Sequence, residues 1–219
     1  MPRMSTRYDQ FCALARAAEI LGERWTLLIV RELMLGAKRF SDLKGRLDGI
    51  SASVLSQRLS QMEVDGLIER AYLEPPAASN VFQLSDFGRA LEPAIYALIR
   101  WGGRLLMPPR PGERREPEWV RLVMQAYARA GRVPRRSFAV RVKDNGTEAA
   151  FSVVGTARGT QVLPEQPSAE VRFTADFQTL LGLMSGRLDS AAAIQEGRIE
   201  AEGDIAALRA FPAMFDPGR

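Results

Sequence analysis

Apolar positions are most regular between residues 39 and 70, where they follow a helical spacing twice. The first of these patterns carries Leu43 and Leu47 on one face, one helical turn apart. An Asp-Gly pair at 48–49 then predicts a turn, because glycine tolerates backbone angles that other residues avoid. The second pattern repeats its apolar positions at i, i+4 and i+7, which predicts one buried stripe: Leu55, Leu59 and Met62.

Serine residues stand where each of these two helices is expected to begin. We predict that the first helix opens at Ser41, and that Ser51 or Ser53 caps the second. A serine hydroxyl can accept a hydrogen bond from the free backbone N–H groups of a first helical turn.

The second helix has an unusual polar face, made of small, uncharged, hydrogen-bonding side chains. Its members are Ser53, Ser56, Gln57 and Ser60. Solvated helices usually fill this face with Glu and Lys, so these residues favour a surface that approaches another molecule closely. Helix, turn and polar-faced helix is the plan of a helix-turn-helix, whose second helix enters the DNA major groove. Plain solvated surface is the alternative, since many helix-turn-helix pairs bind no DNA.

Two helical patterns precede this pair. Residues 11–22 predict a helix with one apolar face, which consists of Phe11, Leu14, Ala18 and Leu21. Residues 23–36 are apolar almost all round, so they predict the central helix of the domain. Its apolar positions include Trp25, Leu28, Ile29 and Leu33.

The residues after the polar-faced helix predict a hairpin and then a longer helix. Residues 67–73 and 80–84 alternate as strands, and the proline-containing stretch 75–79 predicts the loop between them. Together with the two helices, this hairpin forms the pattern of a winged helix-turn-helix. Ser85-Asp86 then predicts the start of a helix that extends to residue 106, with Pro93 as a kink or as a late start. Its expected apolar stripe is Leu91, Ile95, Leu98 and Trp101.

The proline-rich, charged residues 108–117 predict a linker between an N-terminal domain, 1–107, and a C-terminal domain, 118–219. The second domain mixes helices with short strands, which predicts an α+β fold. Asp144-Asn145-Gly146 predicts the turn of a hairpin. The remaining expected strands and helices are 138–142, 148–154, 160–163, 170–174 and 198–202 as strands, and 118–130, 175–184, 190–195 and 204–211 as helices. A cavity between the sheet and the helices would fit this arrangement.

Composition narrows the chemistry. The 219 residues contain one cysteine and no histidine, which excludes an intramolecular disulfide, a cysteine-rich zinc site and every Ser-His or Cys-His nucleophile pair. Asp and Glu still leave acid–base chemistry open. The net charge of +4 is spread along the chain and favours nucleic acid only weakly. Neither an apolar run of about 20 residues nor a signal-peptide core is present, so we expect a cytoplasmic protein that does not enter a membrane.

Short motifs in close order give the first domain a family resemblance. They are Cys12, Gly22-Glu23-Arg24-Trp25-Thr26, Arg31-Glu32-Leu33, Arg39-Phe40-Ser41-Asp42-Leu43, Gly49-Ile50-Ser51, Leu55-Ser56-Gln57-Arg58-Leu59, Gly66-Leu67-Ile68, Leu84-Ser85, Gly88 and Trp101. This run resembles the HxlR-type winged-helix transcriptional regulators. The resemblance implies a homodimer that binds a pseudo-palindromic operator in double-stranded DNA and is held together by the first and last helices of this domain.

Two features bear on how far the resemblance extends. Family members often carry a basic residue in the wing, but residues 74–80 contain none. Some members sense oxidants or electrophiles through a cysteine near the first helix, and Cys12 occupies the matching position. A small buried hydrophobic residue in a dimer interface is the alternative role for Cys12.

The second half resembles sterol carrier protein-like domains. The matching residues are Asp176-Phe177, Leu180-Leu181, Gly186-Arg187, Ala191, Gly197-Arg198-Ile199 and Glu202-Gly203-Asp204. This resemblance implies helices over a sheet with an apolar cavity for a lipid-like ligand. A purely structural α+β domain is the alternative.

We therefore expect a DNA-binding regulator that needs no cofactor or metal, modulated by an apolar small molecule or through Cys12. The expected DNA-contacting residues are Lys38, Arg39, Ser41, Lys44, Ser51, Ser53, Ser56, Gln57, Arg58, Ser60, Ser79 and Asn80. Gln57 can pair bidentately with adenine, while the basic residues suit phosphates. For Arg58 an intradomain ion pair with Glu63 or a neighbouring acid is the alternative. Two other functions stay open: a ligand carrier or enzyme whose N-terminal domain serves only assembly, and an architectural DNA-binding protein without an effector.

Overall fold

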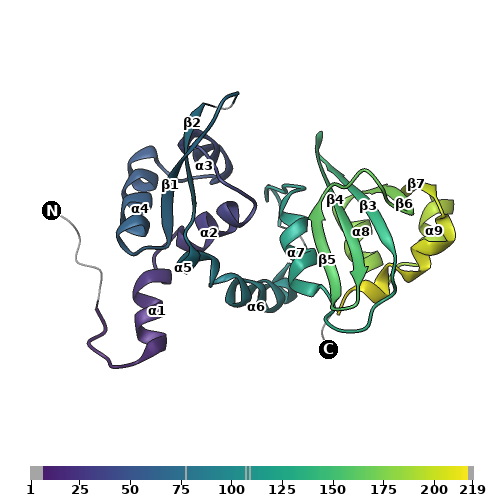
Figure 1. Ribbon diagram of the computed structural model, residues 1–219, viewed down its shortest axis with the longest axis horizontal. Coiled ribbons are helices and arrows are strands. Elements are labelled where there is room, and N and C mark those ends of the chain that lie inside the picture. The colour runs from purple at the N-terminus through teal and green to yellow at the C-terminus, as the bar shows by residue number, and fades with distance from the viewer. Residues whose placement is uncertain (1–6, 77, 107, 109, 217–219) are drawn as a thin grey trace. The chain divides into compact units, whose positions relative to one another are not determined.

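The computed structural model describes residues 7–76, 78–106, 108 and 110–216, and these residues divide into two compact units (Figure 1). The first unit comprises residues 1–95 and the second comprises residues 96–219. Pro109 of the predicted linker and Ala77 of the predicted wing loop lie outside the described residues. The predicted domain limits, 1–107 and 118–219, remain a prediction.

The first unit is helical with a two-stranded hairpin (Figure 1). Its elements are α1 (Ala13–Leu21), α2 (Thr26–Met34), α3 (Phe40–Arg46), α4 (Ala52–Val64), β1 (Ile68–Leu73), β2 (Ser79–Leu84) and α5 (Asp86–Arg89). β1 and β2 pair antiparallel with Ile68 opposite Leu84 and Leu73 opposite Ser79, which is the predicted wing. The predicted winged helix-turn-helix is therefore confirmed.

The core of this unit lies between α2, α3, α4 and the hairpin. As expected, Leu43 and Leu47 point inward from the first helix of the pair. The stripe of α4 is buried as well: Leu55, Leu59 and Met62 are at most 2% exposed. Gly49 joins the two helices with a φ of +83°, a conformation that side chains other than glycine rarely adopt.

The apolar face predicted for the first helix is not buried within the chain. Phe11 and Leu14 stand among the most exposed large apolar residues, and α1 buries only Ala15. The predicted helix is confirmed, and among the described residues no element packs on Phe11 or Leu14. An apolar period shows that a face seeks burial, but it does not say which chain covers that face.

The long helix predicted from Ser85 to residue 106 is interrupted. Ser85 Oγ accepts a hydrogen bond from the backbone N–H of Gly88 at 3.0 Å and caps α5, which ends at Arg89. α6 (Glu92–Gly102) then begins, with Pro93 in its first turn, where the missing N–H costs no hydrogen bond. Of the two expected roles for Pro93, the late start is confirmed. A short 3₁₀ helix, η1 (Gly103–Leu105), follows.

The second unit contains a mixed five-stranded sheet in the order β5-β4-β3-β6-β7 (Figure 1). Its elements are α7 (Trp119–Tyr127), β3 (Ser137–Asp144), β4 (Thr147–Thr156), β5 (Gly159–Pro164), β6 (Val171–Ala175), α8 (Phe177–Met184), α9 (Ser190–Gln195), β7 (Ile199–Gly203), η2 (Ile205–Ala210) and η3 (Pro212–Met214). β3 and β4 form the predicted hairpin around Asn145-Gly146, and β3 pairs parallel with β6. The α+β class is confirmed.

Aromatic side chains fill the space between this sheet and its helices. The ring of Phe211 lies 5.2 Å from Phe138, 5.1 Å from Phe173 and 5.2 Å from Phe215, each in an edge-to-face arrangement, and all four are fully buried. Such contacts add to the burial of apolar area. The cavity expected between sheet and helices remains a prediction. The last expected helix, 204–211, forms as the 3₁₀ helix η2 instead of an α-helix.

Among the described residues, no helix has both the length and the apolar character needed to cross a membrane.

Candidate nucleic-acid interface

The polar flank of α4 faces outward, opposite the buried stripe of Leu55, Leu59 and Met62. Ser56, Gln57 and Ser60 are exposed on this flank. None of the three has a side-chain hydrogen bond to any other residue that the structure describes. We call these three residues the free flank. Their donors and acceptors are available to a partner, because the free flank and the buried stripe lie on opposite sides of one helix.

The start of α4 distinguishes the two expected capping residues. Ser51 is the N-cap, and its Oγ accepts a hydrogen bond from the backbone N–H of Val54 at 3.2 Å. Ser53 lies inside the first turn, exposed, with its hydroxyl 3.0 Å from that of Ser51. Both hydroxyls are therefore engaged within the helix start, unlike those of the free flank.

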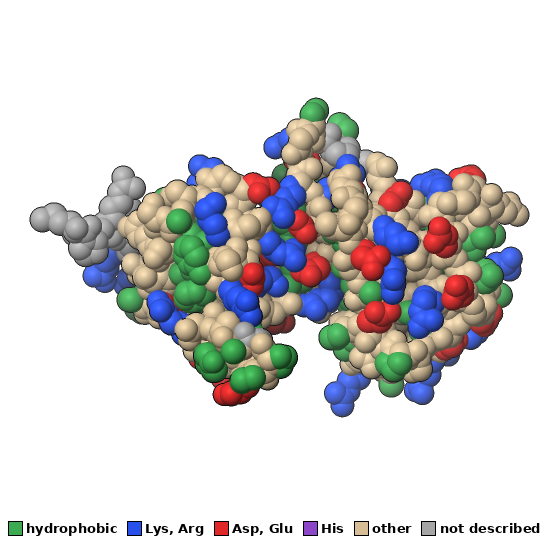
Figure 2. All heavy atoms as spheres, turned by 90° about the horizontal axis from the view of Figure 1, so that it is seen from above, with side chains coloured by type: hydrophobic (Ala, Val, Ile, Leu, Met, Phe, Trp, Pro, Cys, Tyr) green, Lys and Arg blue, Asp and Glu red, His purple; other side chains and the backbone are tan. Residues whose placement is uncertain are grey.

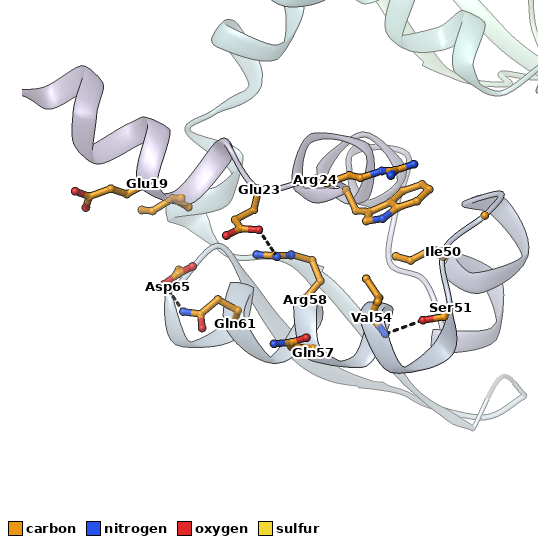
Figure 3. A pocket seen from close by; sticks show the side chains of 13 residues that line it. Glu19, Glu23, Arg24, Ile50, Ser51, Val54, Gln57, Arg58, Gln61 and Asp65 are labelled. Carbon is orange, nitrogen blue, oxygen red and sulfur yellow. Dashed lines mark hydrogen bonds and ion pairs between the residues drawn. The ribbon is translucent and has the colours of Figure 1, made fainter. Parts of the chain in front are cut away.

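Arg58 points away from the free flank of α4 and toward the turn between α1 and α2 (Figure 3). Its Nη2 lies 2.7 Å from a carboxylate oxygen of Glu23, and the Arg58 side chain is 17% exposed. The structure thus shows an intradomain ion pair, the alternative considered for this residue, with Glu23 as its acid. Glu63, the other acid considered, pairs instead with Arg70 at 2.8 Å.

A groove of about 670 Å³ separates this turn from α4 (Figure 3). Its walls combine charged, amide and apolar side chains: Glu19, Ile20, Glu23, Arg24, Trp25, Gly49, Ile50, Ser51, Val54, Gln57, Arg58, Gln61 and Asp65. Gln57 belongs both to this groove and to the free flank. The groove therefore borders the surface that α4 offers to a partner.

The wing receives a cation from a neighbouring segment. Arg39 Nε donates a hydrogen bond to Ser79 Oγ at 2.8 Å, so a guanidinium lies beside a hairpin whose own residues 74–80 lack one. Lys38 pairs with Phe82 through two backbone hydrogen bonds, N to O 3.0 Å and 2.8 Å. Residues 38–39 thus extend the edge of the hairpin.

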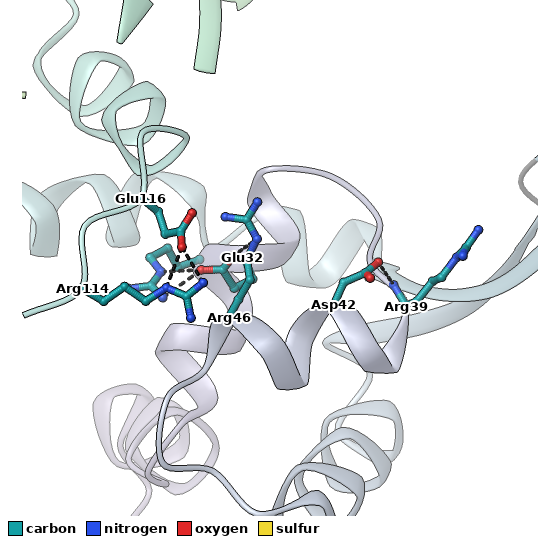
Figure 4. A network of polar contacts seen from close by, with 7 residues as sticks. Glu32, Arg39, Asp42, Arg46, Arg114 and Glu116 are labelled. Atoms are coloured by element: carbon teal, nitrogen blue, oxygen red, sulfur yellow. Dashed lines mark hydrogen bonds and ion pairs between the residues drawn. The ribbon is translucent and has the colours of Figure 1, made fainter. Parts of the chain in front are cut away.

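α3 begins one residue earlier than predicted, and its cap differs. The carboxylate of Asp42 accepts a hydrogen bond from the backbone N–H of Arg39 at 3.0 Å, as Figure 4 shows, and Arg39 is the N-cap residue. Ser41, the predicted cap, is an exposed residue inside the first turn. The Asp42 carboxylate thus binds the backbone of the N-cap residue, a role that the prediction of Ser41 as the cap overlooked.

A buried carboxylate links α2 to α3. Glu32 is fully buried, with Arg31 Nη2 at 2.8 Å and Arg46 Nε at 3.8 Å from its oxygens (Figure 4). A buried charge is costly unless paired, so this contact fixes where α3 lies against the central helix.

The other expected contact residues occupy varied places. Lys44 is half-buried on α3, while Asn80 is exposed on β2, opposite Tyr72 of β1. Ser79 and Asn80 therefore belong to the second strand of the wing.

One residue next to α4 was overlooked by the sequence-based interpretation. Arg24 is exposed, borders the groove, and its guanidinium carbon lies 5.0 Å from the ring centroid of Trp25. Its position within the Gly22-to-Thr26 motif was the available signal, but the motif was treated as a helix start.

Cys12 is exposed at the N-terminal boundary of α1. None of the described residues buries Cys12, and its two expected roles, as a sensor and as a buried residue of a dimer interface, remain predictions.

Comparison with known proteins matches both halves of the chain to family models. Residues 20–109 match the HxlR-like helix-turn-helix family, and residues 121–216 match the SCP-2 sterol transfer family.

Curated relatives match the first half. The chain is similar to the HTH-type transcriptional regulator YvaP of Bacillus subtilis, with 33% identity over 93 residues that cover 42% of this chain and 86% of the relative. The regulator Mb3122 of Mycobacterium bovis is 40% identical over 99 residues, which cover 45% of this chain and 61% of the relative. YtcD of Bacillus subtilis is 34% identical over 84 residues, which cover 38% of this chain and 67% of the relative.

Wing, helix pair and matches together define a transcriptional regulator of the helix-turn-helix type that carries a second domain. The chain belongs to the HxlR-like helix-turn-helix family, and its second domain is of the SCP-2 sterol transfer type.

The cap of α4 yields a test of the helix start. Ser51→Ala is expected to lower the free energy of unfolding by about 1 kcal/mol, because the N–H of Val54 loses its acceptor. Urea titration followed by circular dichroism measures the change. The control is Ser53→Ala, which removes a hydroxyl two residues later and is expected to cost less than about 0.5 kcal/mol. A larger loss for Ser53→Ala than for Ser51→Ala would contradict this assignment.

Proposed function

We propose that this protein binds operator DNA sequence-specifically and that α4 is its reading helix. The observation that carries the proposal is the free flank of Ser56, Gln57 and Ser60, whose side chains have no partner among the described residues. Glutamine can bond bidentately to adenine in the major groove, and serine hydroxyls donate or accept. Ser51 and Ser53 would lie beside the DNA at the start of the same helix.

Phosphate contacts would come from the segments that flank α4. Lys38, Arg39 and Lys44 supply the cations, and the hydrogen bond from Arg39 to Ser79 would place one of them at the wing. Ser41, Ser79 and Asn80 add neutral donors. Arg58 would reach a phosphate only by exchanging its contact with Glu23. These contacts would set register and affinity, while Gln57 would discriminate bases.

Gln57→Ala is expected to weaken operator binding about 5- to 150-fold, equivalent to about 1–3 kcal/mol for a lost bidentate base contact, while affinity for random DNA stays unchanged. Fluorescence anisotropy would measure both, with an operator selected from a random oligonucleotide pool. Gln83→Ala is the matched control, since Gln83 lies on β2 and donates to Glu69. Equal losses on operator and random DNA would rule out base reading by Gln57.

We further propose that the protein acts as a homodimer. Two helices carry apolar side chains that their own chain leaves exposed: Phe11 and Leu14 at α1, and Leu98 and Trp101 on α6. Exposed apolar patches of this kind mark interfaces between proteins. A two-fold pair would present two copies of α4 to half-sites about one helical turn apart.

Leu14→Glu is expected to shift the protein from dimer to monomer at micromolar concentration, because a carboxylate would replace an apolar side chain in the interface. Sedimentation velocity distinguishes the two states. Tyr72→Glu serves as the control, since Tyr72 is an exposed apolar residue on the wing and should leave the dimer intact. A wild-type protein that sediments as a monomer would refute the homodimer.

The second unit supports a further candidate function, which is response to an apolar small molecule. A groove of about 460 Å³ lies in this unit, with a largely apolar wall. Residues that line it include Ile99, Leu106, Val123, Tyr127, Leu181 and Met184. Phe215, one of the four phenylalanines of the core, also lines this groove. Together with oxidation or alkylation of Cys12, the groove is a candidate for the input that alters DNA binding.

A fluorescent fatty-acid probe tests the groove. The probe is expected to bind the wild type and to change operator affinity, whereas Leu181→Trp should fill the groove and reduce probe binding at least tenfold. The control Ile205→Trp alters an exposed residue outside the groove. Probe binding that leaves operator affinity unchanged would favour a carrier whose first domain serves only assembly, and no probe binding would remove the apolar effector.

A further inference from the structure

Arginines gather at one end of the second unit's sheet. The loop between α7 and β3, residues 128–136, and the turn between β4 and β5, residues 157–158, lie at the same end (Figure 1). Segments 128–137 and 155–164 contain five arginines and no acidic residue. The five are Arg129, Arg132, Arg135, Arg136 and Arg158.

Backbone hydrogen bonds hold the two segments together. The N–H of Gly131 donates to the carbonyl of Arg158 at 3.0 Å, and the N–H of Thr160 donates to the carbonyl of Arg129 at 2.8 Å. The N–H of Gly155 donates to the carbonyl of Arg136 at 2.9 Å. The arginines of both segments are thus placed by a fixed backbone and not by a loose loop.

Two of the five arginines are already occupied. Arg129 donates through Nε and Nη2 to the carbonyl of Phe215, at 3.2 Å and 3.0 Å. Arg136 lies 2.7 Å from Glu170 and 3.7 Å from Asp204, and the hydrogen bond to Glu170 raises the pKa of Arg136 above its ordinary value. These two serve the fold.

The other three are exposed and have no side-chain partner among the described residues. They are Arg132, Arg135 and Arg158, which we call the arginine patch. Arg132 and Arg135 border a hollow of about 460 Å³ whose floor includes Thr156 and Ala157. A concave surface edged by unpaired guanidinium groups fits an anion with several oxygens, because guanidinium bonds phosphate in a planar, bidentate manner.

The distribution of charge between the units indicates which anion. Residues 1–95 contain 12 Lys and Arg against 12 Asp and Glu, so the unit with the helix-turn-helix has no net charge. Residues 96–219 contain 18 against 14, so the whole excess of +4 lies in the second unit. On the face in Figure 2, blue and red side chains are interspersed. DNA affinity depends largely on neutralising phosphates, and the first unit has no excess charge for this.

The neighbourhood of the patch does not fit a lipid surface. Proteins that lie on membranes insert apolar side chains beside their basic residues. None of the exposed large apolar residues in the described chain falls within 128–137 or 155–164, and Val133, between Arg132 and Arg135, is buried.

We propose that the arginine patch is a second DNA-binding surface, which contacts phosphates of the duplex without reading sequence. This inference rests on the proposed DNA binding of the first unit and assigns part of the affinity to the SCP-2-type domain. Each of the three guanidinium groups would neutralise one phosphate.

The test is the salt dependence of DNA binding by the full chain. A triple variant carries Arg132→Gln, Arg135→Gln and Arg158→Gln. It is expected to make the negative slope of log K against log salt shallower by roughly 2–3 per protomer, on both operator and random DNA. The ratio of the two affinities should stay unchanged, since phosphate contacts carry no base information. The matched control is Lys143→Gln, Arg172→Gln and Arg209→Gln, which removes three exposed, unpaired cations from elsewhere in the same unit. Its slope should change by less than one.

An unchanged slope in the patch variant would overturn the proposal, as would an equal change in the control. Loss of binding to phosphatidylglycerol vesicles with an unaltered DNA slope would overturn it in favour of a membrane surface. Failure of the proposed function has a different result: the wild type would bind every selected sequence no better than random DNA. The salt dependence of binding to random DNA would still show whether the arginine patch contacts phosphates.

Discussion

The packing of three residues on α4 is the constraint on which the rest of the first unit depends. Leu55, Leu59 and Met62 are buried against the core, so α4 has a single rotation about its own axis. Burying each of these side chains contributes about 1.5–3 kcal/mol, more than any exposed hydrogen bond could offset. Gln57 therefore faces outward, whatever it contacts there. The polar flank is available to DNA because the opposite flank is committed to the core.

In the second unit, too, the packing of apolar side chains determines which surfaces are left for function. In its core the ring of Phe211 packs edge-to-face against three other phenylalanines, and all four side chains are buried. Apolar space lies in the groove that includes Val123 and Leu181. The candidate functional surfaces of this SCP-2-type domain are a groove lined by residues of its helices and the arginines at one end of its sheet.

The sequence predicted most of this fold, because local rules agree with the tertiary structure. Asn145-Gly146 predicts a hairpin from local turn preference alone. The i, i+4, i+7 spacing of Leu55, Leu59 and Met62 identifies a buried stripe. Features that depend on partners far along the chain, or outside it, were not predictable. Phe11 is exposed because no described element of its own chain packs on it, and the spacing of apolar residues does not identify a covering partner. Arg58 pairs with Glu23, 35 residues away, where the prediction considered nearby acids first. For the candidate site, residue types could be named, but which of them are free required coordinates.

The ion pair with Glu23 neutralises the positive charge that Arg58 gives to α4. A phosphate that approaches Arg58 meets a guanidinium already satisfied by a carboxylate at 2.7 Å, so it must displace that carboxylate before it gains a contact. Exchange of one anion for another releases little free energy, so under the proposed DNA binding Arg58 would add little to the affinity of α4 for phosphate. If α4 reads DNA as proposed, its affinity would therefore depend more on its free flank of Ser56, Gln57 and Ser60 than on Arg58.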